Sequence, residues 1–115
     1  TPLTTLMVRN IPASYTKAML FREWECEGRC DFLYLPRNCA SKVNLSYAFV
    51  NFLTERGAAD FRARWHKARL VRFRAQKVLN IVYADVQGLA ANIRRLEQKR
   101  NYCDVKGCQC EPVVT

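Results

Sequence analysis

The chain has 115 residues, half of them apolar and a quarter charged, which suits the core of one domain and excludes wholesale disorder. No apolar run approaches the ~20 residues that a membrane span needs. The chain begins at Thr1 rather than at a methionine, so we expect a domain excised from a longer protein.

Nineteen Lys and Arg against ten Asp and Glu give a formal net charge of +9. Such an excess on one small domain favours a polyanionic partner, nucleic acid before an anionic membrane. The excess is concentrated in residues 62–77, which hold seven basic residues and no acidic one. The alternative interpretation of this run is a solvated face that keeps the protein soluble.

Catalytic and metal-binding side chains are scarce. His66 has no nucleophile or paired carboxylate near it in sequence, so we expect a surface histidine and no enzyme. The six cysteines fit reduced thiols of an intracellular protein, nuclear or cytoplasmic, better than a disulfide framework. Cys103, Cys108 and Cys110 lack the fourth ligand of structural zinc. We therefore expect no metal or other cofactor, and a flexible tail over residues 101–115.

The hydrophobic pattern predicts strands over residues 5–10, 31–35, 45–53 and 78–83. It predicts helices from Ser14 or Thr16 to about Glu27, stopped by Gly28, then from Thr54 through Trp65, and over about 86–100. This order is that of a ferredoxin-like α+β sandwich over residues 1–100. Two helices cover one face of a four-stranded antiparallel sheet, and the other face is left open.

Residues 45–52 match the RNP octamer of RNA recognition motifs at five of its seven specified positions. Because residues i and i+2 of a strand share a face, Ala48, Val50 and Phe52 should point into the core. Tyr47 and Phe49 then stand on the open face as platforms for two unstacked bases. Residues 6–11 fit the companion hexamer on the neighbouring first strand.

Three positions depart from these motifs: Leu45 replaces a basic residue, Ser46 replaces glycine, and Met7 replaces an aromatic residue. We predict an RNA-binding sheet face made of Met7, Arg9, Tyr34, Leu45, Tyr47, Phe49, Asn80 and Val82. A basic periphery for phosphates is predicted at Arg37, Lys42, Arg69, Arg72, Arg74 and Lys77.

Residues 4–12, 15–16, 19–20 and the Asp-Phe-Leu-Tyr-Leu-Pro stretch at 31–36 resemble the C-terminal RNA recognition motif of Mei2-like proteins. Residues 44–52, 77–78, 83–84 and 87–88 continue the resemblance, which runs to about Leu96. It implies a regulator that binds RNA, in that family linked to meiosis or differentiation. The family usually has glycine where Ser46 stands, and residues 101–115 have no counterpart in it.

Two questions stay open at this point. The C-terminal helix either packs against one end of the core, which we favour, or lies across the sheet, with Leu89, Ile93 and Leu96 covering the aromatic platforms. The domain is predicted to bind single-stranded RNA as a monomer away from membranes. The alternative function is a protein-interaction domain of the same fold that binds a peptide.

Overall fold

A computed structural model of the chain describes residues 2–38, 40–41, 43–74, 77–100 and 113–114. The strands are β1 (Thr5–Arg9), β2 (Cys30–Tyr34), β3 (Tyr47–Phe52), β4 (Asn80–Tyr83) and β5 (Val113–Val114). The helices are α1 (Lys17–Glu23), α2 (Glu55–Trp65) and α3 (Leu89–Arg100), with a 3-10 turn, η1 (Arg72–Arg74), between α2 and β4. Each predicted strand and helix is therefore present with shifted ends.

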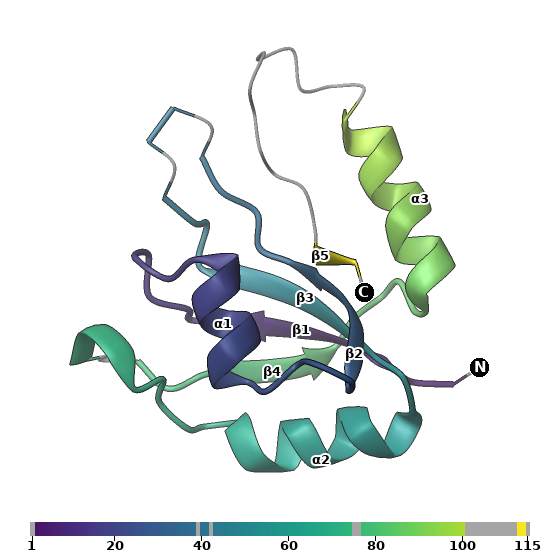
Figure 1. Cartoon of the computed structure of the whole chain (residues 1–115), viewed down its shortest axis with the longest axis horizontal. Coiled ribbons are helices and arrows are strands. Elements are labelled where there is room, and N and C mark those ends of the chain that lie inside the picture. Colours follow the sequence, from purple (N-terminus) through teal and green to yellow (C-terminus); the bar gives the residue numbers. More distant parts are fainter. Residues whose placement is uncertain (1, 39, 42, 75–76, 101–112, 115) are drawn as a thin grey trace.

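The strands form one antiparallel sheet in the order β4-β1-β3-β2-β5 (Figure 1). β1 and β3 lie at its centre, and α1 and α2 pack on one face. The ferredoxin-like sandwich predicted from the sequence is confirmed. In Figure 1, α2 and α3 lie on opposite sides of the strands.

Alternate residues of the strands build the core against the helices. Leu6 and Val8 of β1 and Val50 of β3 are fully buried, as the two-residue period of a strand requires. Phe61 of α2 packs against them and meets Trp24 edge to face, with ring centroids 5.2 Å apart. The predicted inward face of the sheet is confirmed.

The two helices of this face begin as predicted, but α1 ends early. Thr16 and Thr54 cap α1 and α2 through their side-chain oxygens, which accept from backbone N–H groups 3.2 and 2.9 Å away. The predicted end of α1 near Glu27 is wrong, because Glu25 takes the left-handed conformation (φ 52°) that terminates a helix. Its N–H donates to the carbonyl of Arg22, and α1 ends at Glu23, four residues before the predicted end.

The C-terminal segment contributes a strand that the sequence does not predict. Val113–Val114 pairs with Phe32 and Leu33 along the outer edge of β2. The rest of the predicted flexible tail, residues 101–112 and 115, lies outside the described residues, as do its three cysteines. In the described part of the chain no helix is long and apolar enough to cross a bilayer.

Candidate nucleic-acid interface

The register of the sheet brings the predicted face residues together on the side away from α1 and α2. Across the middle of the sheet, Met7 pairs with Val82 on β4 and with Phe49 on β3, and Phe49 pairs with Tyr34 on β2. Directly paired residues share a face. Phe49 lies opposite the buried side of β3, so this whole row faces outward. Val82 is 36% exposed, and the other three side chains are half-buried.

A second row crosses the same face one step further along the strands. Arg9 pairs with Tyr47 on β3 and with Asn80 on β4. Arg9 and Asn80 are exposed and Tyr47 is half-buried. The Tyr47 and Phe49 rings stand 5.8 Å apart at an interplanar angle of 84°. Two neighbouring aromatic rings with a cation beside them suit the stacking of unpaired bases.

The loop between β2 and β3 places the remaining predicted residues beside this face. Arg37 is half-buried and forms an isolated backbone β-bridge with Asn44, and Leu45 is 49% exposed. Ser46, between Leu45 and the strand, has φ 71°, a conformation in which glycine is favoured. This backbone explains why the motif specifies glycine there. Lys42 lies outside the described residues.

Helix α3 lies over one end of the open face. A cavity of only about 20 Å³ separates α3 from the sheet. It is lined by Phe32, Tyr34 and Phe49 of the sheet and by Asn92, Arg95 and Leu96 of α3. The Arg95 guanidinium sits 5.7 Å from the centre of the Phe49 ring, within cation–π range. The favoured prediction, that α3 caps one end of the core, is therefore wrong. The helix covers Phe49 and leaves the Arg9–Tyr47–Asn80 row outside this contact.

Buried polar residues that the sequence analysis missed hold the start of α3 on the sheet. Asn51 accepts from the Thr5 hydroxyl at 2.7 Å and donates to the Asp31 carboxylate at 2.7 Å. The amide of Asn92 donates to the same Thr5 hydroxyl at 3.2 Å. The Gln87 side chain accepts from the Thr5 N–H at 2.8 Å and donates to its carbonyl at 2.9 Å. Polar residues within an otherwise apolar pattern were the available signal for this network.

Residues 66–79 join α2 to β4 and are called the basic link below. Arg69, Arg72 and Lys77 are exposed, and the side chain of Arg74 lies outside the described residues. The link is attached to the start of α1, where the Arg72 N–H donates to the Tyr15 hydroxyl at 2.9 Å. His66 at its beginning is half-buried, and its Nδ1 accepts from the Ile81 N–H at 3.0 Å. The prediction of a plain surface histidine is thus only half right.

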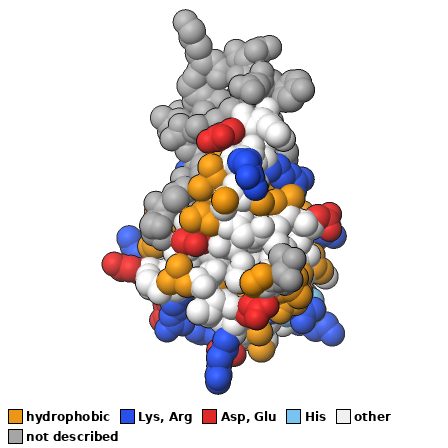
Figure 2. All heavy atoms as spheres, turned by 90° about the vertical axis from the view of Figure 1, so that its right-hand side faces the viewer, with side chains coloured by type: hydrophobic (Ala, Val, Ile, Leu, Met, Phe, Trp, Pro, Cys, Tyr) orange, Lys and Arg blue, Asp and Glu red, His pale blue; other side chains and the backbone are white. Residues whose placement is uncertain are grey.

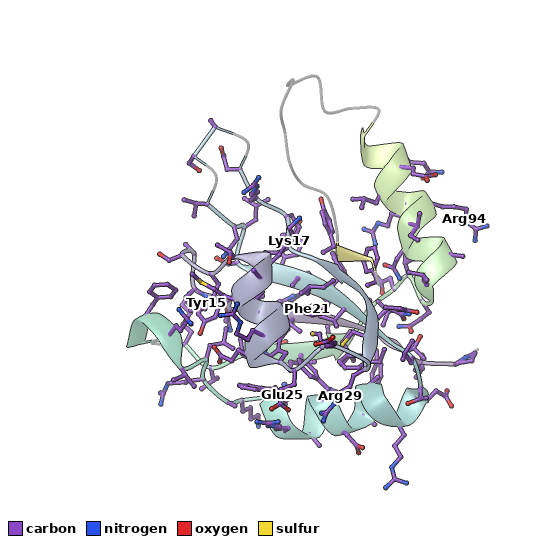
Figure 3. The ribbon with its side chains drawn as sticks, in the orientation of Figure 1. Tyr15, Lys17, Phe21, Glu25, Arg29 and Arg94 are labelled. Carbon is purple, nitrogen blue, oxygen red and sulfur yellow. The ribbon has the colours of Figure 1, made fainter. Side chains whose placement is uncertain are left out.

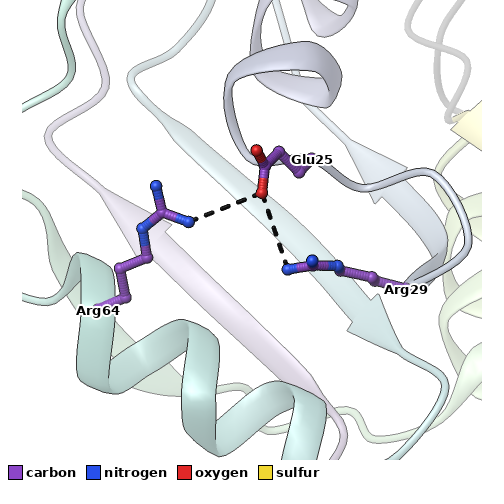
Figure 4. Close-up of polar contacts among 3 residues, drawn as sticks. All are labelled: Glu25, Arg29 and Arg64. Carbon is purple, nitrogen blue, oxygen red and sulfur yellow. Dashed lines mark ion pairs between the residues drawn. The ribbon is translucent and has the colours of Figure 1, made fainter.

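The helical side of the sheet carries exposed ion pairs and buried thiols. Glu25 forms exposed ion pairs with Arg29 and Arg64 at 3.9 and 3.7 Å (Figure 4), and such surface pairs contribute little to stability. Cys26 and Cys30 are both buried. A hydrogen bond with Cys26 and burial raise the pKa of the Cys30 thiol. No group of three metal-binding side chains occurs within the described ranges.

Charge and apolar surface are mixed on the side of the molecule that carries α3. Figure 2 shows hydrophobic side chains there in small groups separated by charged ones. Arg94 of α3 points away from the strands (Figure 3), whereas its neighbour Arg95 lies over Phe49. Two adjacent arginines of one helix therefore have different surroundings.

A four-stranded antiparallel sheet with two helices on one face and aromatic side chains on the other defines an RNA recognition domain. The model of the family described as RNA recognition motif 2 matches residues 3–97, and the chain belongs to that family. Domains of this class bind RNA and are not enzymes.

Plant relatives cover nearly the whole chain. Protein MEI2-like 4 of Arabidopsis thaliana is 33% identical over 113 residues, which are 96% of this chain and 12% of that protein. Protein MEI2-like 5 of Oryza sativa subsp. japonica is 33% identical over 92% of this chain and 13% of its own length. The chain therefore spans about an eighth of these relatives.

Solved structures share the fold. A Sex-lethal protein–RNA complex superposes with a TM-score of 0.62 at 22% identity, covering 74% of this chain and 48% of the other. The Rna15 RNA recognition domain with bound RNA gives a TM-score of 0.61 at 13% identity, covering 82% of this chain and 96% of the other. At these identities the likeness concerns the fold alone.

Proposed function

We propose that the open face of the sheet binds single-stranded RNA, with Tyr47 and Phe49 as base-stacking platforms. The observation that carries the proposal is the placement of these two rings side by side at the centre of the sheet, next to Arg9. Base–aromatic stacking contributes ~1–3 kcal/mol per base and tolerates any base. Met7 and Val82 supply apolar contact beside the rings, and Asn80 supplies an amide at the β4 edge.

The phosphates contact basic side chains around this face. The structure describes the side chains of Arg9, Arg37, Arg69, Arg72 and Lys77 in this set, and we extend the set to Lys42 and Arg74. Contacts of this kind raise affinity for every sequence and weaken with salt. Replacing Arg69 and Arg72 with Gln should flatten the salt dependence by up to ~0.7 for each phosphate interaction removed, without a change in base preference.

The two platforms differ in their access to RNA. The cavity between α3 and Phe49 has room for about one water molecule and none for a base. A base therefore stacks on Phe49 only after α3 has moved away. Tyr47, with Arg9 and Asn80, lies beyond the covered end and receives RNA first. In this proposal α3 regulates how much of the sheet RNA occupies.

For the full-length protein we propose a post-transcriptional regulator inside the cell, in line with the Mei2-like resemblance. The support is the identity of about one third with MEI2-like proteins over nearly the whole chain. The isolated domain is proposed to act as a monomer, and a meiotic role is the family's usual context.

The test compares two tyrosines on opposite faces of the sheet. Tyr47→Ala should weaken binding to oligouridine about 5- to 150-fold, the equivalent of one lost stack. Tyr83→Ala is the matched control, because Tyr83 is 38% exposed but pairs with the buried Leu6 and so faces the helices. Fluorescence anisotropy at several salt concentrations measures both variants. Equal affinities with no salt dependence would exclude the RNA face and favour the alternative, a peptide-binding domain.

A further inference from the structure

The basic link carries an exposed aromatic ring in an unusual backbone conformation. Phe73 is 53% exposed and has φ 61°, in the left-handed region that bulky side chains rarely adopt. Such strain persists only where surrounding contacts hold the residue, and it is often found at functional positions. Burial does not explain the conformation, because more than half of the side chain faces solvent.

Three contacts hold the link in place. The Arg72 N–H donates to the Tyr15 hydroxyl at 2.9 Å, and the Val71 N–H donates to one Glu23 carboxylate oxygen at 3.1 Å. The Tyr15 hydroxyl in turn donates to the other oxygen of that carboxylate at 2.6 Å. The Phe73 ring meets the Tyr15 ring edge to face, with centroids 5.4 Å apart. The ring is thus fixed before any ligand arrives, which lowers the entropy cost of binding.

The same contacts place Phe73 near the open end of the sheet. Tyr15 lies at the start of α1 (Figure 3), and its carbonyl accepts from the Asn44 side chain at 2.9 Å, three residues before Tyr47. On the other side of the link, the Val78 carbonyl accepts from the Asn10 side chain, just after β1, at 3.0 Å. This is the Arg9–Tyr47 end, whereas α3 is attached at the Thr5 end of β1.

The charge around the ring selects the kind of ligand. Arg69, Arg72 and Lys77 are exposed, and residues 62–77 contain no acidic residue. The Glu23 carboxylate, which contacts the link, already accepts hydrogen bonds at both oxygens. A fixed aromatic ring among cations suits a nucleotide, because the ring stacks on the base while the cations contact the phosphates.

We infer that Phe73 is a third base-stacking platform, outside the sheet, for a nucleotide of single-stranded RNA that continues past Tyr47. This inference rests on the proposed function. It makes the RNA site longer than the two or three bases that a sheet face stacks. The length dependence of binding therefore separates the two proposals.

The test uses oligouridines of ~3 and ~10 nucleotides, since stacking does not depend on base identity. Phe73→Leu keeps an apolar side chain but removes the π face. It should bind the short RNA as the wild type does and lose at least about fivefold in affinity for the long one. Val71→Ala is the matched control: Val71 is 81% exposed in the same link and has no ring, so both affinities should be unchanged. Tyr47→Ala should lower the affinity for both RNAs.

Photocrosslinking gives a second measurement. The long RNA substituted with 5-iodouridine should form an adduct with Phe73 that mass spectrometry locates, and the short RNA should not. Unchanged affinity of Phe73→Leu for the long RNA, with no adduct on Phe73, overturns the inference, and a partner protein then becomes the occupant to seek. In that case a loss in Tyr47→Ala still supports the sheet face. If Phe73→Leu loses the same affinity for the short and the long RNA, the inference is also overturned, because the substitution then affects the sheet face or the fold.

Discussion

Replacing Leu96 with alanine should raise the affinity of the domain for RNA. The side chain is 8% exposed and lies against the sheet beside Phe49, where it helps to hold α3 down. Truncating a buried leucine costs ~2–5 kcal/mol. We take about 2 kcal/mol as the weakening of the covered state, because α3 rests on the surface of the sheet rather than in the core. That energy raises the population of the uncovered state about 30-fold, and RNA that needs this state gains up to the same factor.

The assay is anisotropy of labelled oligouridine with the wild type and Leu96→Ala, together with amide hydrogen exchange of α3. Faster exchange in α3 shows that the helix is released, so the two measurements separate release from binding. Arg95→Gln and Arg94→Gln form a second matched pair, since each removes one charge but only Arg95 lies over Phe49. The first should bind RNA more tightly than the second. Faster exchange without tighter binding would refute the reasoning.

Three further outcomes are expected. Ser46→Gly should raise the free energy of unfolding by about 0.5–1 kcal/mol in urea denaturation, because the substitution relieves a left-handed conformation that costs ~1–2 kcal/mol. The control is Ser14→Gly, at an exposed position outside that conformation, which should lower the free energy of unfolding. Burial and a hydrogen bond to a carboxylate raise the pKa of Tyr15 to about 12. The protonated hydroxyl therefore contributes fully to stability below pH ~10, and this contribution is lost as the pH rises toward 12. The difference in free energy of unfolding between the wild type and Tyr15→Phe should shrink over that window, and a constant difference would contradict this. Cys26 and Cys30 should resist iodoacetamide until urea unfolds the domain, as peptide mapping can show, and rapid labelling of the native protein would contradict their burial.

The sequence predicts the sheet well because each strand alternates between a buried and an open face. Leu6, Val8 and Val50 are fully buried, and the outward phase of Tyr47 follows directly from the inward phase of its neighbours. The predictions fail where the backbone departs from ordinary preferences. Glu25 ends α1 in a conformation that favours glycine, whereas the glycine at position 28 indicates an end that is too late.

The position of α3 was not predictable because an amphipathic helix shows which of its sides is apolar but not which surface it will cover. The deciding contacts come from polar residues far apart in the chain, such as Thr5 with Asn92. A two-residue strand such as β5 has too short a pattern to detect. The register brings together the sheet-face residues that the sequence predicts. The tertiary structure decides between the two positions that the sequence leaves open for α3, and there the helix covers Phe49.

The pairing of β5 with β2 has a consequence for how the protein acquires its structure. The paired residues, Leu33 and Val113, are about 80 positions apart, so this contact is among the most non-local in the fold. Such contacts form late, because a long loop must close first. During synthesis the outer edge of β2 therefore stays unpaired until the last residues of this segment emerge. An unpaired edge strand is a template for pairing with other chains. A chain truncated before β5 should consequently aggregate more readily, through the outer edge of β2, the strand that carries Tyr34 of the sheet face.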